Sequence, residues 1–122
     1  MISVKQIEMS DSLYQQERAL RNNVLLRPIG LPDHAWEMND AGALHFIALE
    51  QNRVLGCVVL FPLDKEHHTV QLMQMAVDSK FQGKGIGKLL VDELIKFCAS
   101  KKNQMLVKAR ECAKIENCLR PD

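Results

Sequence analysis

Apolar and polar residues follow one another along this chain with periods that separate strands from helices. Strict alternation over residues 2–7 predicts a first strand. Ser10 or Ser12 can then cap a helix in which Leu13, Leu20 and Val24 recur at helical spacing. Pro28, Gly30 and Pro32 are expected to end this helix. Gln15 has the spacing from Ser12 that a capping box requires. The chain is therefore predicted to begin with a strand followed by a helix.

The next apolar segments predict a hairpin and a covered strand. Residues 44–61 form two apolar runs split by the polar residues 50–53, which is typical of antiparallel strands joined by a turn. Residues 28–42 contain prolines, glycines and Trp36, and they predict a loop or short irregular helix that could line a pocket. Residues 69–77 are apolar on both faces and predict a central strand covered on both sides. One face of this strand is expected to carry Val70 and Leu72, and the other Met73, Met75 and Val77.

A long amphipathic helix and a short strand complete the pattern. The apolar stripe of the helix contains Ile86, Leu89, Leu90, Leu94, Phe97 and Cys98. Lys88, Asp92 and Lys96 are spaced to pair on the opposite side. Residues 105–109 predict a fifth strand. Together these elements predict a single α/β domain over residues 1–122, with a mixed, mostly antiparallel twisted sheet flanked by helices.

Composition narrows the classes of partner. Sixteen Lys and Arg against 15 Asp and Glu give a net charge of +1, which argues against nucleic acid or a membrane surface as a partner. The first residues lack the apolar core of a signal peptide and no apolar stretch is long enough to span a bilayer, so a cytoplasmic location is expected. The cysteines form no CxxC pair, which favours reduced, packed thiols and no metal site. These cysteines are Cys57, Cys98, Cys112 and Cys118.

The stretch VDSKFQGKGIGKLL, residues 77–90, joins the predicted central strand to the amphipathic helix. Its three glycines lie where the first amides of a helix have no intrahelical acceptor. Free N–H groups at the positive end of a helix dipole bind anions, and glycines let phosphate oxygens approach closely. Lys84 and Lys88 are unfavourable at a helix start unless an anion binds there. The stretch therefore predicts a site for a phosphate-containing ligand.

Two common phosphate-binding motifs match this loop poorly. A Walker A loop needs a glycine where Gln82 stands and a hydroxyl residue where Leu89 follows Lys88. The dinucleotide fingerprint begins well at Gly83 and Gly85, but Lys88 takes the place of its third glycine. A nucleotide-binding domain of another class is therefore kept as a rival hypothesis.

The spacing that fits is QxxGxG over residues 82–87, preceded by Met-Ala-Val at 75–77. This arrangement resembles the acetyl-CoA-binding motif of the GCN5-related N-acetyltransferase (GNAT) superfamily. The resemblance covers residues 1–114 and includes LRNNVLLRPIGL at 20–31, His45 and the hairpin with Gly56. It implies the acyl-CoA N-acyltransferase fold. It also implies transfer of an acetyl group from acetyl-CoA to a primary amine of an unknown small-molecule or peptide acceptor.

The resemblance assigns a binding site by position. In the family, the strand equivalent to 69–77 separates from the strand equivalent to 105–109, and the pantetheine arm enters between them. The pantetheine amides are expected on Met75, Ala76 and Val77, with the Met75 amide polarising the thioester carbonyl. The pyrophosphate is expected on the amides of Gln82, Gly83, Lys84, Gly85, Ile86, Gly87 and Lys88. The amine is expected to attack the acetyl carbon directly, with no covalent enzyme intermediate.

The sequence departs from the family at two places. Gln71 occupies a strand position where some members have a glutamate base, so it is expected at most to orient a water. The usual tyrosine acid is missing from residues 111–122, and the last helix and strands of the fold are expected to be lacking. The bared sheet edge could then pair in a homodimer. A catalytically impaired CoA-binding or interaction module is the alternative function.

Five other residues have both a functional and a structural interpretation. His67 and His68 could act as a base, but their polar turn favours solvated residues. His45, in an apolar strand, is better explained as a hydrogen-bonded core histidine than as a catalytic one. Trp36 could flank the acceptor or fasten its loop to the core. Glu50, at the end of the hairpin, is expected to be a surface carboxylate.

Overall fold

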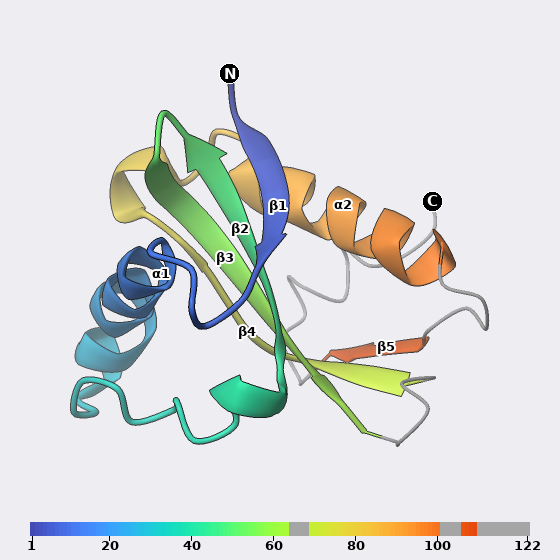
Figure 1. Ribbon diagram of the computed structural model, residues 1–122. Helices are drawn as coiled ribbons and strands as arrows, with labels where there is room; N and C mark the ends of the chain where they lie inside the picture. The colour runs from blue at the N-terminus through green and yellow to red at the C-terminus, as the bar shows by residue number, and fades with distance from the viewer. Residues whose placement is uncertain (64–68, 101–105, 110–122) are drawn as a thin grey trace.

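A computed structural model describes residues 1–63, 69–100 and 106–109 of the chain (Figure 1). The strands are β1 Ser3–Ile7, β2 Leu44–Glu50, β3 Arg53–Pro62, β4 Thr69–Val77 and β5 Leu106–Ala109. The α-helices are α1 Tyr14–Arg21 and α2 Ile86–Ser100. Shorter helical turns are the π-helical η1 Asn22–Leu26 and the 3-10 turns η2 Arg27–Ile29, η3 Asp40–Gly42 and η4 Ser79–Phe81.

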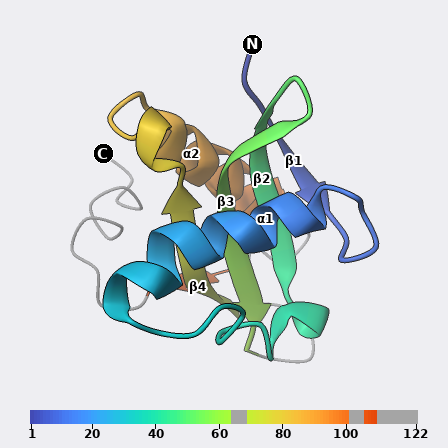
Figure 2. The ribbon, with the colours of Figure 1, turned by 90° about the vertical axis from the view of Figure 1, so that its left-hand side faces the viewer.

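A five-stranded sheet runs through the domain in the order β1-β2-β3-β4-β5. The first four strands are antiparallel neighbours, and β5 lies parallel to β4. Helix α1 covers one face of the sheet and α2 the other (Figure 1 and Figure 2). This arrangement confirms the predicted fold class, a mixed and mostly antiparallel sheet flanked by helices.

The predicted hairpin is formed by β2 and β3, and its turn has the backbone that a tight hairpin needs. Gln51 and Asn52 have φ angles of +49° and +66°. Two successive residues with positive φ are what a type I′ turn requires, and this turn matches the twist of the flanking strands. Asparagine tolerates the left-handed conformation better than most residues, which helps to set the register that pairs Glu50 with Arg53.

Strand β4 contains a bulge that changes which face its side chains occupy. Its register with β3 skips Met73, between Leu72 and Gln74. Past the bulge, Met75 packs on the α2 face, against the same apolar cluster as Leu72. The prediction that Leu72 and Met75 lie on opposite faces is wrong, because alternation in one strand does not reveal an inserted residue. The same correction applies to Val70 and Val77.

Helix α1 begins differently from the prediction. The predicted capping box of Ser12 and Gln15 is not among the hydrogen bonds of the described residues. Asp11 Oδ1 instead accepts a hydrogen bond from the Leu13 amide at 2.8 Å. An acceptor at this place satisfies an amide that has no partner within the helix. The helical path continues through η1 and η2 and ends at Gly30, whose φ of +79° is typical of a helix terminus.

Helix α2 turns its predicted apolar stripe toward the sheet. The buried members of this stripe are Ile86, Leu90, Leu94 and Cys98. On the solvent side, Lys88 Nζ lies 3.3 Å from Asp92 as predicted, whereas Lys96 pairs with Glu93 at 3.4 Å. Exposed pairs of this kind contribute at most about 1 kcal/mol each, so burial of the stripe holds the helix in place.

Two of the four cysteines lie in the described residues. Cys57 and Cys98 are buried in the apolar clusters on the two faces of the sheet, as expected of packed thiols. The predictions outside the described residues concern His67, His68, Cys112, Cys118 and the chain end at 111–122. Within the described segments, no helix is long and apolar enough to cross a membrane.

Candidate active site

In the part of the chain that the structure describes, strand β4 has an open edge over its second half. Its pairing with β5 covers only Thr69 to Leu72, which lie opposite Leu106 to Ala109. Over the described residues, Met73–Val77 have β3 on one side and no strand on the other. The main-chain groups on the open side can therefore pair with an extended ligand, as a peptide does at a sheet edge.

The loop after β4 leads this open edge to the start of α2. Gly83 and Gly85 have φ angles of +80° and +84°, which glycine adopts most readily. The amide of Leu89 bonds to the Gly85 carbonyl at 3.0 Å, which makes it the first amide with a helical acceptor. Within the described part of the chain, the amides at 86–88 have no acceptor. They present free N–H groups at the positive end of the helix dipole, an arrangement that binds phosphate.

Close contacts hold this loop against the sheet. The side-chain Nε2 of Gln82 donates to the Val77 carbonyl at 3.1 Å. A Cβ atom at Gly87 would lie 3.0 Å from the Met75 methyl carbon, so a side chain there would require the end of Met75 to shift. The structure thus brings together four predicted site residues, at the end of β4 and the beginning of α2.

Positive side chains surround the loop. Lys84 Nζ lies 5.4 Å from the centre of the Phe81 ring, and the Arg53 guanidinium lies 5.3 Å from the same ring. Arg53 also pairs with Asp78 at 3.6 Å. Sequence reasoning missed Arg53, because only the pairing of β3 with β4 brings the hairpin turn to this loop. These exposed cations attract an anion chiefly at low ionic strength.

A cavity of about 460 Å³ lies between the end of α1 and the loop after β4. Its walls include Leu20, Val24 and Pro28 on one side and Arg53, Lys80 and Gln82 on the other. This volume is in the range of small-molecule sites, which are about 300–1,000 Å³. Because Gln82 belongs to both the cavity and the glycine loop, the cavity adjoins the loop that leads to the start of α2.

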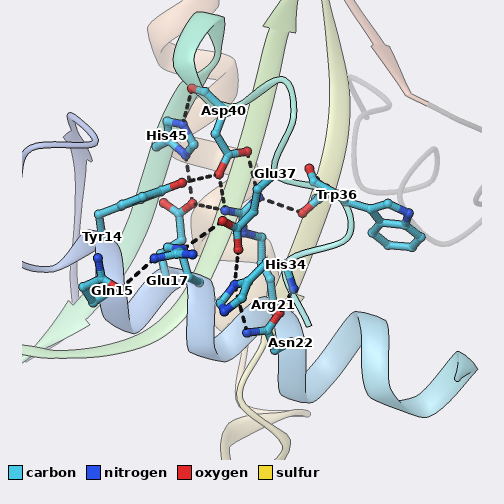
Figure 3. Close-up of polar contacts among 12 residues, drawn as sticks. Tyr14, Gln15, Glu17, Arg21, Asn22, His34, Trp36, Glu37, Asp40 and His45 are labelled. Carbon is cyan, nitrogen blue, oxygen red and sulfur yellow. Dashed lines mark hydrogen bonds and ion pairs between the residues drawn. The ribbon is translucent and has the colours of Figure 1, made fainter. Parts of the chain in front are cut away.

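A buried polar cluster lies between α1 and the sheet (Figure 3). We define it as six residues that are at most 8% exposed, Tyr14, Glu17, Arg21, Asp40, His45 and Gln74. The Arg21 guanidinium binds both carboxylate oxygens of Asp40, lies 3.3 Å from Glu17 and donates to Gln74 Oε1 at 3.0 Å. Helix α1, the η3 turn and strand β4 are therefore joined through one arginine.

His45 is engaged through both ring nitrogens. Nδ1 lies 2.8 Å from Glu17 Oε2, and Nε2 lies 2.9 Å from the Asp40 carbonyl. Burial disfavours the charged imidazole, but the hydrogen bond and charge of Glu17 outweigh it and raise the pKa of His45. Burial likewise opposes ionisation of Asp40, but hydrogen bonds from Arg21 and Tyr14 lower its pKa. The prediction of a hydrogen-bonded core histidine is confirmed.

The same cluster contains residue types that bind metal ions. The ligand atoms of Glu17, Asp40 and His45 all lie within 4.8 Å of one another. Arg21 already pairs with both carboxylates, so its guanidinium supplies the positive charge that an ion would bring. The fork of an arginine suits paired carboxylates, and the donor set fits it better than a metal.

Comparison with known proteins assigns the chain to a family. The chain matches the model of the Acetyltransferase (GNAT) family over residues 7–114, which is most of its length. The protein belongs to the GNAT family. The N-acetylaspartate synthetase of Danio rerio is 38% identical over 63 residues, which are 52% of this chain and 22% of the relative. The chain thus spans only about a fifth of the length of this curated relative.

Solved GNAT structures have the same fold. One is the aminoglycoside acetyltransferase meta-AAC0020 from an uncultured soil metagenomic sample, in complex with trehalose. It has a TM-score of 0.74 and 20% identity, over 98% of this chain and 88% of that one. A GNAT family acetyltransferase from Elizabethkingia anophelis with acetyl-CoA bound has a TM-score of 0.61 and 23% identity. The match covers 80% of this chain and 57% of that one. At these identities the likeness shows the fold, and it confirms the acyl-CoA N-acyltransferase type.

In this GNAT domain the remaining candidates have clear positions. The Trp36 side chain points away from the buried polar cluster and the residue is 39% exposed (Figure 3). Its main-chain carbonyl accepts from Gln74 Nε2 at 3.3 Å and so helps to fasten the loop to β4. Glu50 lies at the surface, as predicted. Its carboxylate is 3.7 Å from the amino-terminal nitrogen. Gln71 is half-buried on β4, opposite Phe61 of β3.

Sequence reasoning missed most of the buried polar cluster. Glu17 and Arg21 stand at positions i and i+4, which is the spacing of an ordinary exposed helix pair. One signal could have revealed them, because they share a helix face with Tyr14, Leu20 and Val24. A polar pair inside an apolar stripe predicts burial with a partner, although it does not identify the partner.

Proposed function

We propose that this GNAT domain is an N-acetyltransferase that moves an acetyl group from acetyl-CoA to a primary amine. The observation that carries the proposal is the open edge at Met73–Val77, which leads to the free amides at 86–88. An extended arm that ends in a diphosphate matches this combination, because a strand edge offers hydrogen bonds and a helix start binds anions. Membership of the GNAT family supports an acyl-CoA donor.

The donor is proposed to lie along two stretches of main chain. The pantetheine arm would pair with Met75, Ala76 and Val77, and the pyrophosphate would bind the amides at 82–88. The Val77 carbonyl already accepts from the side chain of Gln82, so this end of the strand is held before the donor binds. Prior ordering of this kind lowers the cost of binding.

The proposed reaction is a direct attack on the thioester. The lone pair of the neutral amine forms a bond to the acetyl carbon, and the carbonyl oxygen becomes an oxyanion. The Met75 amide would donate to this oxygen and stabilise the transition state by about 3 kcal/mol, as single oxyanion donors do. The carbon–sulfur bond then breaks and the leaving thiolate takes up a proton from solvent water. The nitrogen releases its extra proton to a water that Gln71 would orient.

The acceptor is proposed to be a small amine. The curated relative is named N-acetylaspartate synthetase, and a similar structure is named an aminoglycoside acetyltransferase. An amino acid and an aminoglycoside are therefore the first acceptors to test, with a peptide N-terminus as the third class. The cavity of about 460 Å³ has room for only part of a large acceptor.

Release of free thiol from acetyl-CoA tests this proposal. The chain is mixed with acetyl-CoA and, in turn, with aspartate, an aminoglycoside and a peptide with a free N-terminus. Thiol is measured with a chromogenic reagent and the product by mass spectrometry. The expected result is thiol release that requires the amine and matches the acetylated product. Release that is independent of every amine would contradict direct transfer.

One observation favours the alternative, a CoA-binding module without turnover. Gln71 cannot accept a proton at neutral pH, and the buried carboxylates of Glu17 and Asp40 are held by Arg21. Calorimetric titration of the same preparation with CoA separates the two functions, since binding without turnover favours the module. A clear preference for ATP over CoA in a thermal-shift assay would refute both and favour another class of nucleotide site.

A further inference from the structure

Among the described residues, the β4 segment Met73–Val77 is paired on one side only, with β3. The described residues of β5 pair with β4 as far as Leu72, and the bulge interrupts the ladder with β3. The direction of the Met75 amide therefore depends on side-chain contacts as well as on the sheet. Two glutamines make such contacts, Gln74 near the bulge and Gln82 at the end of the strand.

Gln74 joins β4 to two other parts of the fold. Its Oε1 accepts from Arg21 Nη1 at 3.0 Å, and its Nε2 donates to the Trp36 carbonyl at 3.3 Å. Arg21 is itself anchored by the carboxylates of Asp40 and Glu17 (Figure 3). The residue beside the bulge is thus held both from α1 and from the loop before β2.

The energetics of the buried polar cluster favour a positioning role over a purely stabilising one. Glu17 Oε1 and Arg21 Nε are buried and have no hydrogen-bond partner among the described residues. Buried groups of this kind destabilise a fold, and apolar side chains of similar volume often stabilise it equally well. The α2 face of the same sheet is stabilised in this second way, because its core cluster consists of apolar side chains. The charged residues are better explained by the geometry they impose.

We propose that Gln74, held by Arg21, positions the main chain of the β4 bulge for acyl transfer. Both ends of its amide group are bonded, so the neighbouring amide of Met75 keeps one direction. That direction matters because an oxyanion donor acts only when it already points at the developing charge. The catalytic part of this inference rests on the proposed function, whereas the fixing of the strand does not.

Gln74→Met tests this role, because methionine has a similar length and makes neither hydrogen bond. Arg21 keeps Asp40 and Glu17, so the variant is expected to fold. With an active acceptor, kcat should fall about 10- to 100-fold while the KM for acetyl-CoA changes less than about twofold. In hydrogen exchange, the amides at 74–77 that pair with β3 should exchange faster, and those of β2 should not change.

Two further variants sharpen the test. Gln74→Glu keeps an acceptor for Arg21 and should recover part of the lost kcat. Arg18→Met is the matched control, since Arg18 also joins α1 to the loop, through Glu37 at 2.9 Å. The described contacts of Arg18 are with Glu37, Gln15 and Tyr14, none of which lies on β4. This control should leave both kcat and the exchange of β4 unchanged.

The outcomes separate this inference from the proposed function. Unchanged exchange at 74–77 in Gln74→Met would overturn the inference, even if the wild-type protein transfers acetyl groups. Faster exchange with unchanged kcat would overturn the catalytic part. If the wild-type protein transfers no acetyl group, the proposed function fails together with the catalytic part, and the exchange measurement alone decides whether Gln74 fixes the strand.

Discussion

The two faces of the sheet are packed with different kinds of side chain. On the α2 face, apolar side chains form the core, and the groups available for chemistry are main-chain amides at the edge of β4 and the start of the helix. On the α1 face, a charged and hydrogen-bonded cluster is buried among apolar residues. The comparison teaches that the backbone of the glycine loop depends on neighbours in the chain, whereas a buried cluster of side chains depends on the whole fold.

The largest loss of stability is expected when Arg21, the buried arginine of the α1 face, is removed. Arg21→Ala leaves the carboxylates of Asp40 and Glu17 buried without their cation, and it should lower the free energy of unfolding by about 3–5 kcal/mol. Urea unfolding measures the change. Arg18→Ala breaks a more exposed pair and should cost less than about 1 kcal/mol. Equally small losses in both variants would show that charge does not hold this face.

A second prediction concerns the backbone of the α2 face. A Cβ at Gly85 would meet no atom within 4 Å, so Gly85→Val acts through its φ of +84° and by covering the amides behind it. The strain should cost about 1–2 kcal/mol of stability, and CoA affinity measured by calorimetry should fall about tenfold or more.

Gly30→Val is the matched control for this loop variant. Gly30 has nearly the same φ, +79°, and also has open space at its Cβ position. It lies at the end of the first helical segment and should therefore lose similar stability while keeping CoA affinity. Equal loss of CoA binding in the two variants would contradict the assignment of the glycine loop.

The smallest effect expected is the response of the α1 face to pH. The pKa of His45 is raised in the folded state, so its contribution to stability is full below about pH 6.5 and is lost as the pH rises through the raised value. Each unit of pKa shift corresponds to about 1.4 kcal/mol. Unfolding free energies should therefore decline above neutral pH, and His45→Gln should flatten this decline. The groups facing His45 are Glu17, Asp40, Arg21 and Tyr14. An equally steep decline in the variant would assign it to another residue.

Local sequence was enough to predict most of the elements and the glycine loop. Periodicity identified the strands, the hairpin at 44–61 and the stripe of α2, because each depends on residues that are close in the chain. The positive φ of Gly83 and Gly85 follows the same rule, since a turn into a helix start needs glycine whatever lies across the sheet. The capping box was wrong because the helix begins one residue later than predicted, with Leu13 and not Ser12 as the N-cap residue.

Only the tertiary structure decided how these elements combine into a site. The edge of β4 that the described residues leave open depends on which part of β4 pairs with β5, and the bulge at Met73 depends on the register with β3. The hydrogen bond from Arg21 to Gln74 joins residues 53 positions apart. Backbone conformation is governed by near neighbours, so it can be read along the chain. The partner of a buried side chain is chosen by the fold, and no local pattern of residues identifies it.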